Sequence, residues 1–257
     1  MDIKREPKGS FLLDKNTKLM YNGGIKMKKK TREELKTLSY AEKIDYYANI
    51  NDLISVNNGN HKTGIGCLTM SMPVLTCRPD APCRNNGICY CMRGNQAYPS
   101  VCGAYHRNWR LWTENPDRFE EQLNAILTFS GVGMFRYNDA GEIPDSRFLA
   151  MMFRVAEKHP DVIFLAYTKK YEMINSFLDN GNEIPKNLTI RFSAWDKSWN
   201  VPNPYNLPMA YVDFKHKENN PDIPNNAFMC PGNGKTTCSA CKVCWRKNVR
   251  SVVFKQH

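Results

Sequence analysis

Short apolar runs rich in β-branched and aromatic residues recur along the chain and predict β-strands. They lie at residues 65–72, 132–137, 162–168, 188–194, 210–214, 227–230 and 252–254. Between the central runs lie segments that carry helix start or stop signals. These predicted helices are residues 117–129 after Pro116, residues 145–158 after Pro144, and residues 170–178 before Asn180 and Gly181.

Strands that alternate with helices indicate right-handed β-α-β crossovers and a parallel sheet. We expect an α/β fold, a parallel, partial or distorted (β/α) barrel. From residue 196 onward the sequence is rich in Pro and Asn and carries no strong helix signal. The last units of the barrel are therefore expected to be loops.

The first 60 residues combine a polar lead with one helical segment. Thr31 is an N-cap with Glu34 three residues later, and Ser39 is a point where the helix could divide in two. No change of composition marks a boundary later in the chain. We expect a basic N-terminal segment with a helix at residues 1–60 and a single barrel-like iron-sulfur domain at residues 61–257.

Composition places the chain among globular proteins, with 42% hydrophobic and 24% charged residues. No apolar stretch is long enough for a membrane span, and the opening MDIKREPKGSFLL lacks the apolar core of a signal peptide. We expect a cytoplasmic protein without membrane partners. Motifs for ATP hydrolysis, zinc proteolysis and serine hydrolysis are absent from the sequence.

The net charge of +11 is concentrated at the two ends. Residues 1–48 hold 12 basic and 7 acidic side chains, residues 49–234 hold 18 of each, and residues 235–257 hold 6 basic side chains and no acidic one. Such termini are typical of solvated, solubilising segments, and they could also bind nucleic acid phosphates.

Ten cysteines form two groups and indicate metal binding. One group contains Cys67, Cys77, Cys83, Cys89, Cys91 and Cys102, and the other contains Cys230, Cys238, Cys241 and Cys244. In a cytosolic chain, thiols gathered in short loops are more often metal ligands than disulfides. Because both groups follow predicted strands, we expect both at the carboxyl edge of the sheet, where ligands gather in parallel folds.

The second group has the spacing C-x7-C-x2-C-x2-C. Three cysteines at intervals of three, with a fourth near a Pro-Gly turn, favour an iron-sulfur cube, and all four would be ligands. A zinc site, which usually takes two separated cysteine pairs, and free structural thiols are the alternatives.

The first group has the spacing C-x5-C-x5-C-x-C. We assign Cys77, Cys83 and Cys89 as ligands of a second cluster. The fourth ligand is open between Cys102, Cys91, Cys67 and none, and Cys102 is the first choice. We therefore expect two 4Fe-4S clusters.

Several motifs together resemble the phage gene product 88 family. They are TGIGCLTMSMP, TCRPDAPCRNNGICYCMRG, MFRYNDAGEIPDSRFL, VIFLAYTKK, LTIRFSAWD and MCPG followed by CSACKVCW, and they extend over residues 62–246. The resemblance implies a phage or mobile-element protein with a barrel related to radical S-adenosylmethionine enzymes and with cysteine-bound iron-sulfur clusters.

A looser similarity concerns those radical enzymes themselves. They carry a C-x3-C-x2-C loop after the first strand and a Gly-Gly-Glu-Pro-like turn after the second, which holds the amino group of S-adenosylmethionine. Gly141 and Glu142 resemble that turn, whereas the C-x5-C-x5-C spacing departs from the loop. S-adenosylmethionine is thus a cofactor that the turn favours and the cysteine spacing opposes. A cofactor pocket at strand ends would also recruit Arg136 and Ser193.

Three hypotheses follow for the function. The first is an iron-sulfur protein with a structural role or with redox or radical chemistry. The second is a zinc-stabilised protein that binds nucleic acid through its basic termini. The third is a phage-encoded inhibitor of a host factor, in which metals stiffen loops.

Overall fold

The computed structural model describes the chain at residues 11–13, 19–21, 29–85, 87–195, 197, 199–213, 222–232 and 236–256. Most of the basic start of the chain and the predicted strand end at Phe214 lie outside these ranges. The chain forms two compact units. Unit 1 contains Met1–Ser55 and Tyr98–Gly131, and unit 2 contains Val56–Ala97 and Val132–His257.

Unit 1 is helical apart from one short antiparallel strand pair. Its elements are β1 (Phe11–Leu13), β2 (Leu19–Tyr21), α1 (Arg32–Thr37), α2 (Tyr40–Asn49), α4 (Pro99–Glu114) and α5 (Pro116–Ser130). These units differ from the predicted division at residue 60, because the middle helices α4 and α5 belong to the same unit as α1 and α2.

The break in the N-terminal helix at Ser39 is confirmed. Thr31 caps α1 and Ser39 caps α2, and each forms a capping box with the glutamate three residues later, Glu34 and Glu42. Helix α4 was not predicted, because Cys102 in its first turn was assigned to the cysteine loop. Pro99 at the start of α4 supplies the start signal.

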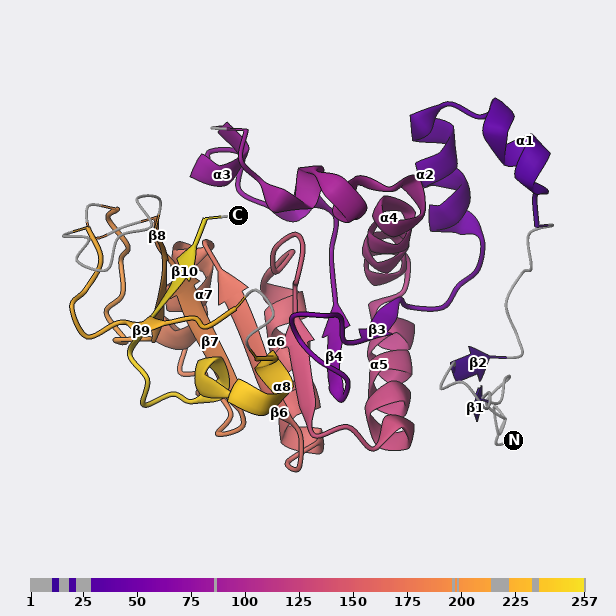
Figure 1. The fold of residues 1–257 in the computed structure, drawn as a ribbon. Helices are drawn as coiled ribbons and strands as arrows, with labels where there is room; N and C mark the ends of the chain where they lie inside the picture. Colours follow the sequence, from indigo (N-terminus) through magenta and orange to yellow (C-terminus); the bar gives the residue numbers. More distant parts are fainter. Residues whose placement is uncertain are drawn as a thin grey trace, which may run out of the picture. The chain divides into compact units, whose positions relative to one another are not determined.

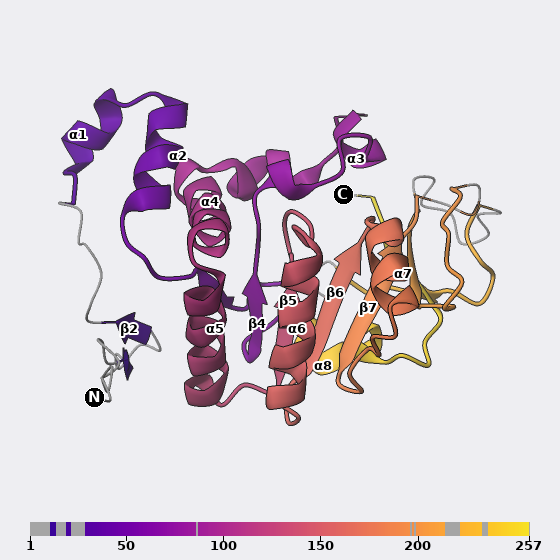
Figure 2. The same ribbon diagram turned by 180° about the vertical axis from the view of Figure 1, so that it is seen from behind.

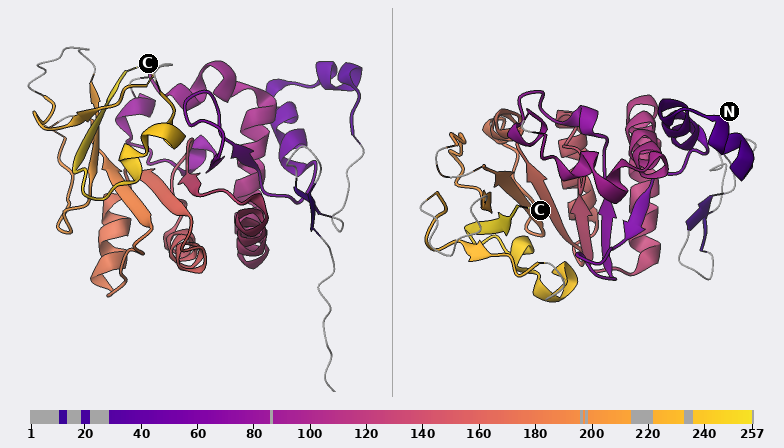
Figure 3. Two further views of the ribbon diagram at one scale, coloured as in Figure 1. Left: turned by 60° about the horizontal axis from the view of Figure 1, so that its bottom comes forward. Right: turned by 45° about the horizontal axis from the view of Figure 1, so that its top comes forward.

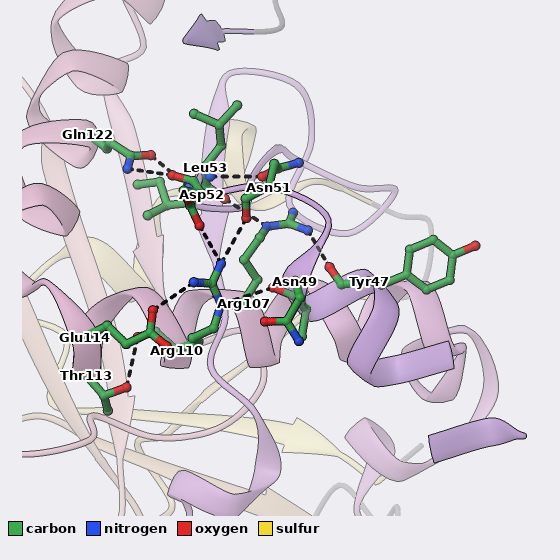
Figure 4. Close-up of polar contacts among 12 residues, drawn as sticks. Tyr47, Asn49, Asn51, Asp52, Leu53, Arg107, Arg110, Thr113, Glu114 and Gln122 are labelled. Atoms are coloured by element: carbon green, nitrogen blue, oxygen red, sulfur yellow. Dashed lines mark hydrogen bonds and ion pairs between the residues drawn. The ribbon is translucent and has the colours of Figure 1, made fainter. Parts of the chain in front are cut away.

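Helices α2 and α4 approach each other closely at Gly103. A β-carbon at this position would lie 2.3 Å from the β-carbon of Tyr47. The segment that follows α2 is then fixed by side chains of α4 and α5 (Figure 4). Arg107 donates to the carbonyls of Tyr47 and Leu53, both at 2.8 Å, and Gln122 of α5 donates to the carbonyl of Asp52 at 3.0 Å. These hydrogen bonds fix the position of the segment that follows α2, although this segment forms no helix or strand.

Unit 2 is built on an eight-stranded sheet with the order β3-β4-β5-β6-β7-β8-β10-β9. The strands are β3 (Val56–Asn58), β4 (Cys67–Met70), β5 (Met134–Tyr137), β6 (Ile163–Thr168), β7 (Leu188–Ser193), β8 (Met209–Asp213), β9 (Phe228–Met229) and β10 (Ser251–Lys255). Strand β3 is antiparallel to β4, and all other neighbours are parallel. Mixed α/β architecture with a mainly parallel sheet is therefore confirmed, while closure into a barrel stays a prediction.

Each predicted strand is present, with shorter bounds in most cases. The crossover helices α6 (Ser146–Lys158) and α7 (Tyr171–Asp179) also match their predicted segments. The C-terminal stretch is not a free basic tail, because β10 lies between β8 and β9 with Val252 and Val253 buried.

The two faces of the sheet are covered in different ways. Helices α6 and α7 cover one face (Figure 2), on which Tyr137 and Phe164 stack at 5.9 Å between ring centroids. The C-terminal segment with α8 (Cys238–Cys241) and the short 3-10 turn η4 (Val243–Trp245) lies over the other face (Figures 1 and 3). We call this second face the inner face.

Arg191 of β7 holds the C-terminal segment on the inner face. Its side chain is fully buried and donates to four main-chain carbonyls, at 2.7 Å to Cys244, 2.9 Å to Val249, 2.9 Å to Arg246 and 3.4 Å to Val243. Burial lowers the pKa of Arg191. The guanidinium nevertheless stays charged in proteins, so its donors remain available to these carbonyls.

We expect Arg191→Met to lower the free energy of unfolding by about 3 to 5 kcal/mol, because it leaves several buried carbonyls without donors. Urea denaturation followed by circular dichroism measures the change.

The matched control is Arg147→Met, since this side chain is 68% exposed and pairs with Asp145 at 3.1 Å. An exposed pair of this kind contributes at most about 1 kcal/mol. Equal stability of the two variants would contradict the role given to Arg191.

Candidate functional site

The upstream cysteine loop begins where β4 ends. Because β4 is parallel to β5, the loop leaves the sheet at its carboxyl edge, as predicted. Short helical turns position the thiols, namely η1 (Val74–Thr76), α3 (Pro82–Asn85), η2 (Tyr90–Met92) and η3 (Gly94–Ala97). Cys77 directly follows η1, Cys83 lies in α3, Cys89 precedes η2 and Cys91 lies within it.

The four thiols of this loop act on one another. The neighbouring thiol of Cys89 raises the pKa of Cys83, and the thiol of Cys91 raises the pKa of Cys89. Burial raises the pKa of Cys77 to about 12, with further contributions from the negative charge of Glu142 and from Cys83 and Cys89. We call Cys77, Cys83, Cys89 and Cys91 the edge thiols.

Glu142 lies beside the edge thiols and is itself buried, at 5% exposure. Its carboxylate accepts two hydrogen bonds of 2.8 Å, one from the hydroxyl of Thr168 and one from the backbone amide of Lys169. Its own amide donates to the Thr76 hydroxyl at 2.9 Å. Burial raises the pKa of Glu142, and the charge of Lys169 and these bonds act in the opposite direction.

Lys169 supplies positive charge next to the edge thiols. It lies directly after β6, and its charge opposes the rise in the pKa of Cys77 and of Cys83. The carboxyl edge therefore combines buried and partly buried thiols, the carboxylate of Glu142, and the ammonium groups of Lys169 and Lys170. The prediction that the upstream cysteine loop lies at the carboxyl edge of the sheet is therefore confirmed.

The predicted cofactor residues do not all gather at this edge. Gly141 and Glu142 lie there, whereas Arg136 of β5 forms an ion pair with Asp139 at 3.0 Å and lies over the Tyr167 ring. Ser193 is the last residue of the parallel strand β7 and therefore also lies at the carboxyl edge, where its carbonyl accepts a hydrogen bond from the hydroxyl of Tyr171. Besides Asp139, the charge of Arg136 interacts with Tyr90, Tyr167 and the thiol of Cys238.

The second cysteine group lies mainly on the inner face. Cys238 and Cys244 pack against a buried cluster formed by Cys67, Met134, Leu165 and Trp245. The indole nitrogen of Trp245 donates to the carbonyl of Phe135 at 3.3 Å, and the Thr189 hydroxyl donates to the carbonyl of Trp245 at 2.8 Å.

The expectation that both groups lie at the carboxyl edge is therefore wrong for Cys238 and Cys244. Cys230 follows β9 as predicted. Beyond it the chain turns back over the sheet, because Arg191 binds the carbonyls around Cys244. Cys67, the first residue of β4, lies with this group and not in the upstream loop.

The remaining cysteines have other surroundings. Cys102 lies in α4 of unit 1, with its sulfur 3.6 Å from the Tyr40 hydroxyl. Cys241 is the last residue of α8 and is half-buried. Among the described residues of unit 2, Cys241 is not one of those that pack against the inner-face cluster around Cys67.

The donor sets fit a thiolate-bound cluster by their chemistry. Within the described ranges, no group of three or more His, Cys, Asp or Glu side chains is arranged to hold a single metal ion. Thiols are nevertheless the only soft donors in both groups, and soft thiolates favour iron-sulfur clusters or zinc. The thiolates of a cluster bind different iron atoms and therefore lie further apart than the thiolates that bind a single metal ion.

Sequence reasoning missed three contributors to the inner face, namely Arg191, Tyr167 and Trp245. Tyr167 hydrogen-bonds Cys244, and burial raises its pKa well above the ordinary value. The signal that could have found Tyr167 and Arg191 is their position on neighbouring strands, at paired register positions of β6 and β7. A polar residue in an otherwise apolar strand indicates that this face of the sheet is covered by a segment with polar groups to bind.

Gly141 is required for the turn that positions Glu142. Its φ angle is +74°, and a β-carbon there would lie 2.3 Å from the carbonyl oxygen of Met72. We expect Gly141→Ala to lower the free energy of unfolding by at least about 3 kcal/mol, since backbone overlap adds to the cost of a left-handed conformation. Thermal or urea denaturation measures this effect.

Gly181→Ala is the matched control, because Gly181 has a φ angle of +82° and no atom near the new β-carbon. It should cost only about 1 to 2 kcal/mol, the cost of the left-handed conformation alone. If the two variants are equally stable, the close approach to Met72 has no energetic role.

Comparisons with known proteins identify the family. No helix among the described residues has both the length and the apolar character needed to cross a membrane. No curated protein and no solved structure matches the sequence. A family model described as Gene product 88 matches residues 25–247, which include both cysteine groups and all predicted cofactor residues. The chain therefore belongs to the gene product 88 family.

Proposed function

We propose that this phage or mobile-element protein is an iron-sulfur protein that holds two 4Fe-4S clusters on a partial barrel. The observation that carries the proposal is that short turns after β4 place Cys77, Cys83 and Cys89 in one loop at the carboxyl edge, near Glu142 and Lys169. Ligands of parallel α/β folds bind at this edge. The clusters would serve electron transfer or hold the cysteine loops in place.

Cys91 is the favoured fourth ligand of the edge cluster. It is buried, and its thiol is close enough to raise the pKa of Cys89. Cys67 lies instead among the inner-face residues, and Cys102 has the hydroxyl of Tyr40 as a partner. A fourth thiolate from Cys91 would complete the coordination of the cluster from within one loop.

The surroundings of the edge thiols also favour a cluster. Burial makes four thiolates in one loop costly unless positive charge offsets them, which iron provides directly. Lys169 adds a further positive charge to this edge. When bound, the cluster supplies a one-electron redox centre, and the chain's own residues hold and shield it.

S-adenosylmethionine is not part of the proposal. The two carboxylate oxygens of Glu142 already accept hydrogen bonds from Thr168 and Lys169. S-adenosylmethionine needs one iron without a thiolate ligand, and a fourth thiolate from Cys91 would occupy that iron. The residues at this turn instead brace the loop that carries the edge thiols.

We expect anaerobically purified protein to contain about eight irons and about eight acid-labile sulfides per chain, as two cubes require. Cys83→Ala should lose about half of both, because it removes a central edge thiol. Iron and sulfide assays with electron paramagnetic resonance of the reduced protein give the measurement.

Cys102→Ala is the control, since its partner in unit 1 is Tyr40. It should keep the iron content of the unchanged protein. Zinc in place of iron in both groups would contradict the proposal and would support the zinc-stabilised nucleic-acid-binding alternative. If the purified protein contains no metal, the better hypothesis is an interaction protein without metal, such as an inhibitor of a host factor.

A further inference from the structure

Cys67 lies where a ligand from the sheet would meet the second cysteine group. It is fully buried, begins β4 and shares the inner face with its register partner Met134. Cys238 and Cys244 pack against the same cluster of residues. A thiol from the first part of the sheet and two thiols from the C-terminal segment therefore meet on one face.

The electrostatic contacts connect four thiols. The negative charge of Cys238 acts on Cys67, and Cys244 and Cys230 act on Cys238. Cys230 also acts on Cys244. Cys241 is not among the described residues that pack against the cluster of Cys67, Met134, Leu165 and Trp245, whereas Cys238 and Cys244 are.

The backbone reverses its direction directly after Cys241. Helix α8 is a single turn, so Cys238 and Cys241 occupy its two ends. Lys242 then adopts a left-handed conformation with φ of +57°, which reverses the chain and brings Cys244 to the sheet. Arg191 fixes that return through the carbonyl of Cys244.

The start of α8 is bound to the segment before β4. The amides of Cys238 and Ser239 donate to the carbonyls of Lys62 and Thr63, both at 2.9 Å. Gly64 makes this approach possible, since a β-carbon there would lie 2.3 Å from the Ser239 hydroxyl oxygen. Lys62 and Thr63 are only a few residues before Cys67 in the sequence. Their hydrogen bonds to the start of α8 therefore keep Cys238 near Cys67.

Arg136 supplies a donor and a positive charge at the same place. Its charge opposes the rise in the pKa of Cys67, Cys238 and Cys244. Its terminal nitrogen pairs with Asp139, while its Nε is buried and has no hydrogen-bond partner among the described residues. A buried N–H without a partner is costly unless a ligand accepts from it.

We infer that Cys67 joins Cys238 and Cys244 as a ligand of the second cluster, that the Nε of Arg136 donates to a cluster sulfur, and that Cys241 is not a ligand. Cys230, which follows β9, stays the fourth ligand that the sequence predicts. The inference rests on the proposed function, since it requires the protein to hold iron-sulfur clusters. In the ligand set predicted from the sequence, Cys67 of β4 thus takes the place of Cys241. The cluster would then connect the C-terminal segment to β4.

Cys67→Ala and Cys241→Ala test the ligand set directly. Anaerobically purified Cys67→Ala should retain about half of the iron and sulfide of the unchanged protein, one cube out of two. Cys241→Ala should retain all of it. Loss of iron from Cys241→Ala, or full iron content in a folded Cys67→Ala, would overturn the inference.

Leu165→Val controls for damage to the buried cluster, because Leu165 packs beside Cys67 and carries no ligand. It should keep full iron content, so that the loss in Cys67→Ala is due to the missing thiol. If Cys67→Ala does not fold, alkylation of the iron-loaded, unchanged protein decides. Iodoacetamide should label Cys241 and spare Cys238 and Cys244, and protection of Cys241 would overturn the inference.

The same measurements separate the two proposals. An unchanged protein without iron and sulfide contradicts the proposed function, and the ligand set then has no cluster to bind. An unchanged protein with two clusters, combined with iron loss in Cys241→Ala, contradicts only the ligand set.

Discussion

The guanidinium of Arg191 is the contact on which the inner face depends. The C-terminal segment has little regular structure, so its carbonyls cannot be satisfied by a helix or a sheet ladder. One buried side chain from β7 supplies donors to four of them. With these carbonyls held, Trp245 and Cys244 are pressed against the strands. A lysine could not do the same, because only the planar guanidinium presents several donors in a fixed geometry.

Both thiol groups follow the same physical rule, although their surroundings differ. Each gathers sulfur atoms in a place from which water is largely excluded, and each has a cation beside it, Lys169 at the carboxyl edge and Arg136 on the inner face. Such positions make thiolates costly in the metal-free chain. Binding of a metal centre would therefore displace protons and stabilise the fold at the same time.

The sheet could be predicted because its central strands are apolar runs separated by capped helices. Strand β3 could not be, since Val56–Asn58 lies beside an Asn-rich loop and is a strand only through pairing with β4. The edge thiols could also be predicted, because their loop is local. The place of Cys67 could not, because it depends on a segment near the other end of the chain that Arg191 folds back over the sheet.

The position of β10 between β8 and β9 sets the order in which the protein can assemble during synthesis. The middle strands and the upstream cysteine loop leave the ribosome first, and they can form before residues 251–255 exist. Until then β8 presents an unpaired edge, and the inner face lacks its cover. Final closure of this face is thus a late, long-range step, which leaves the nascent chain vulnerable to aggregation until residues 251–255 have been made.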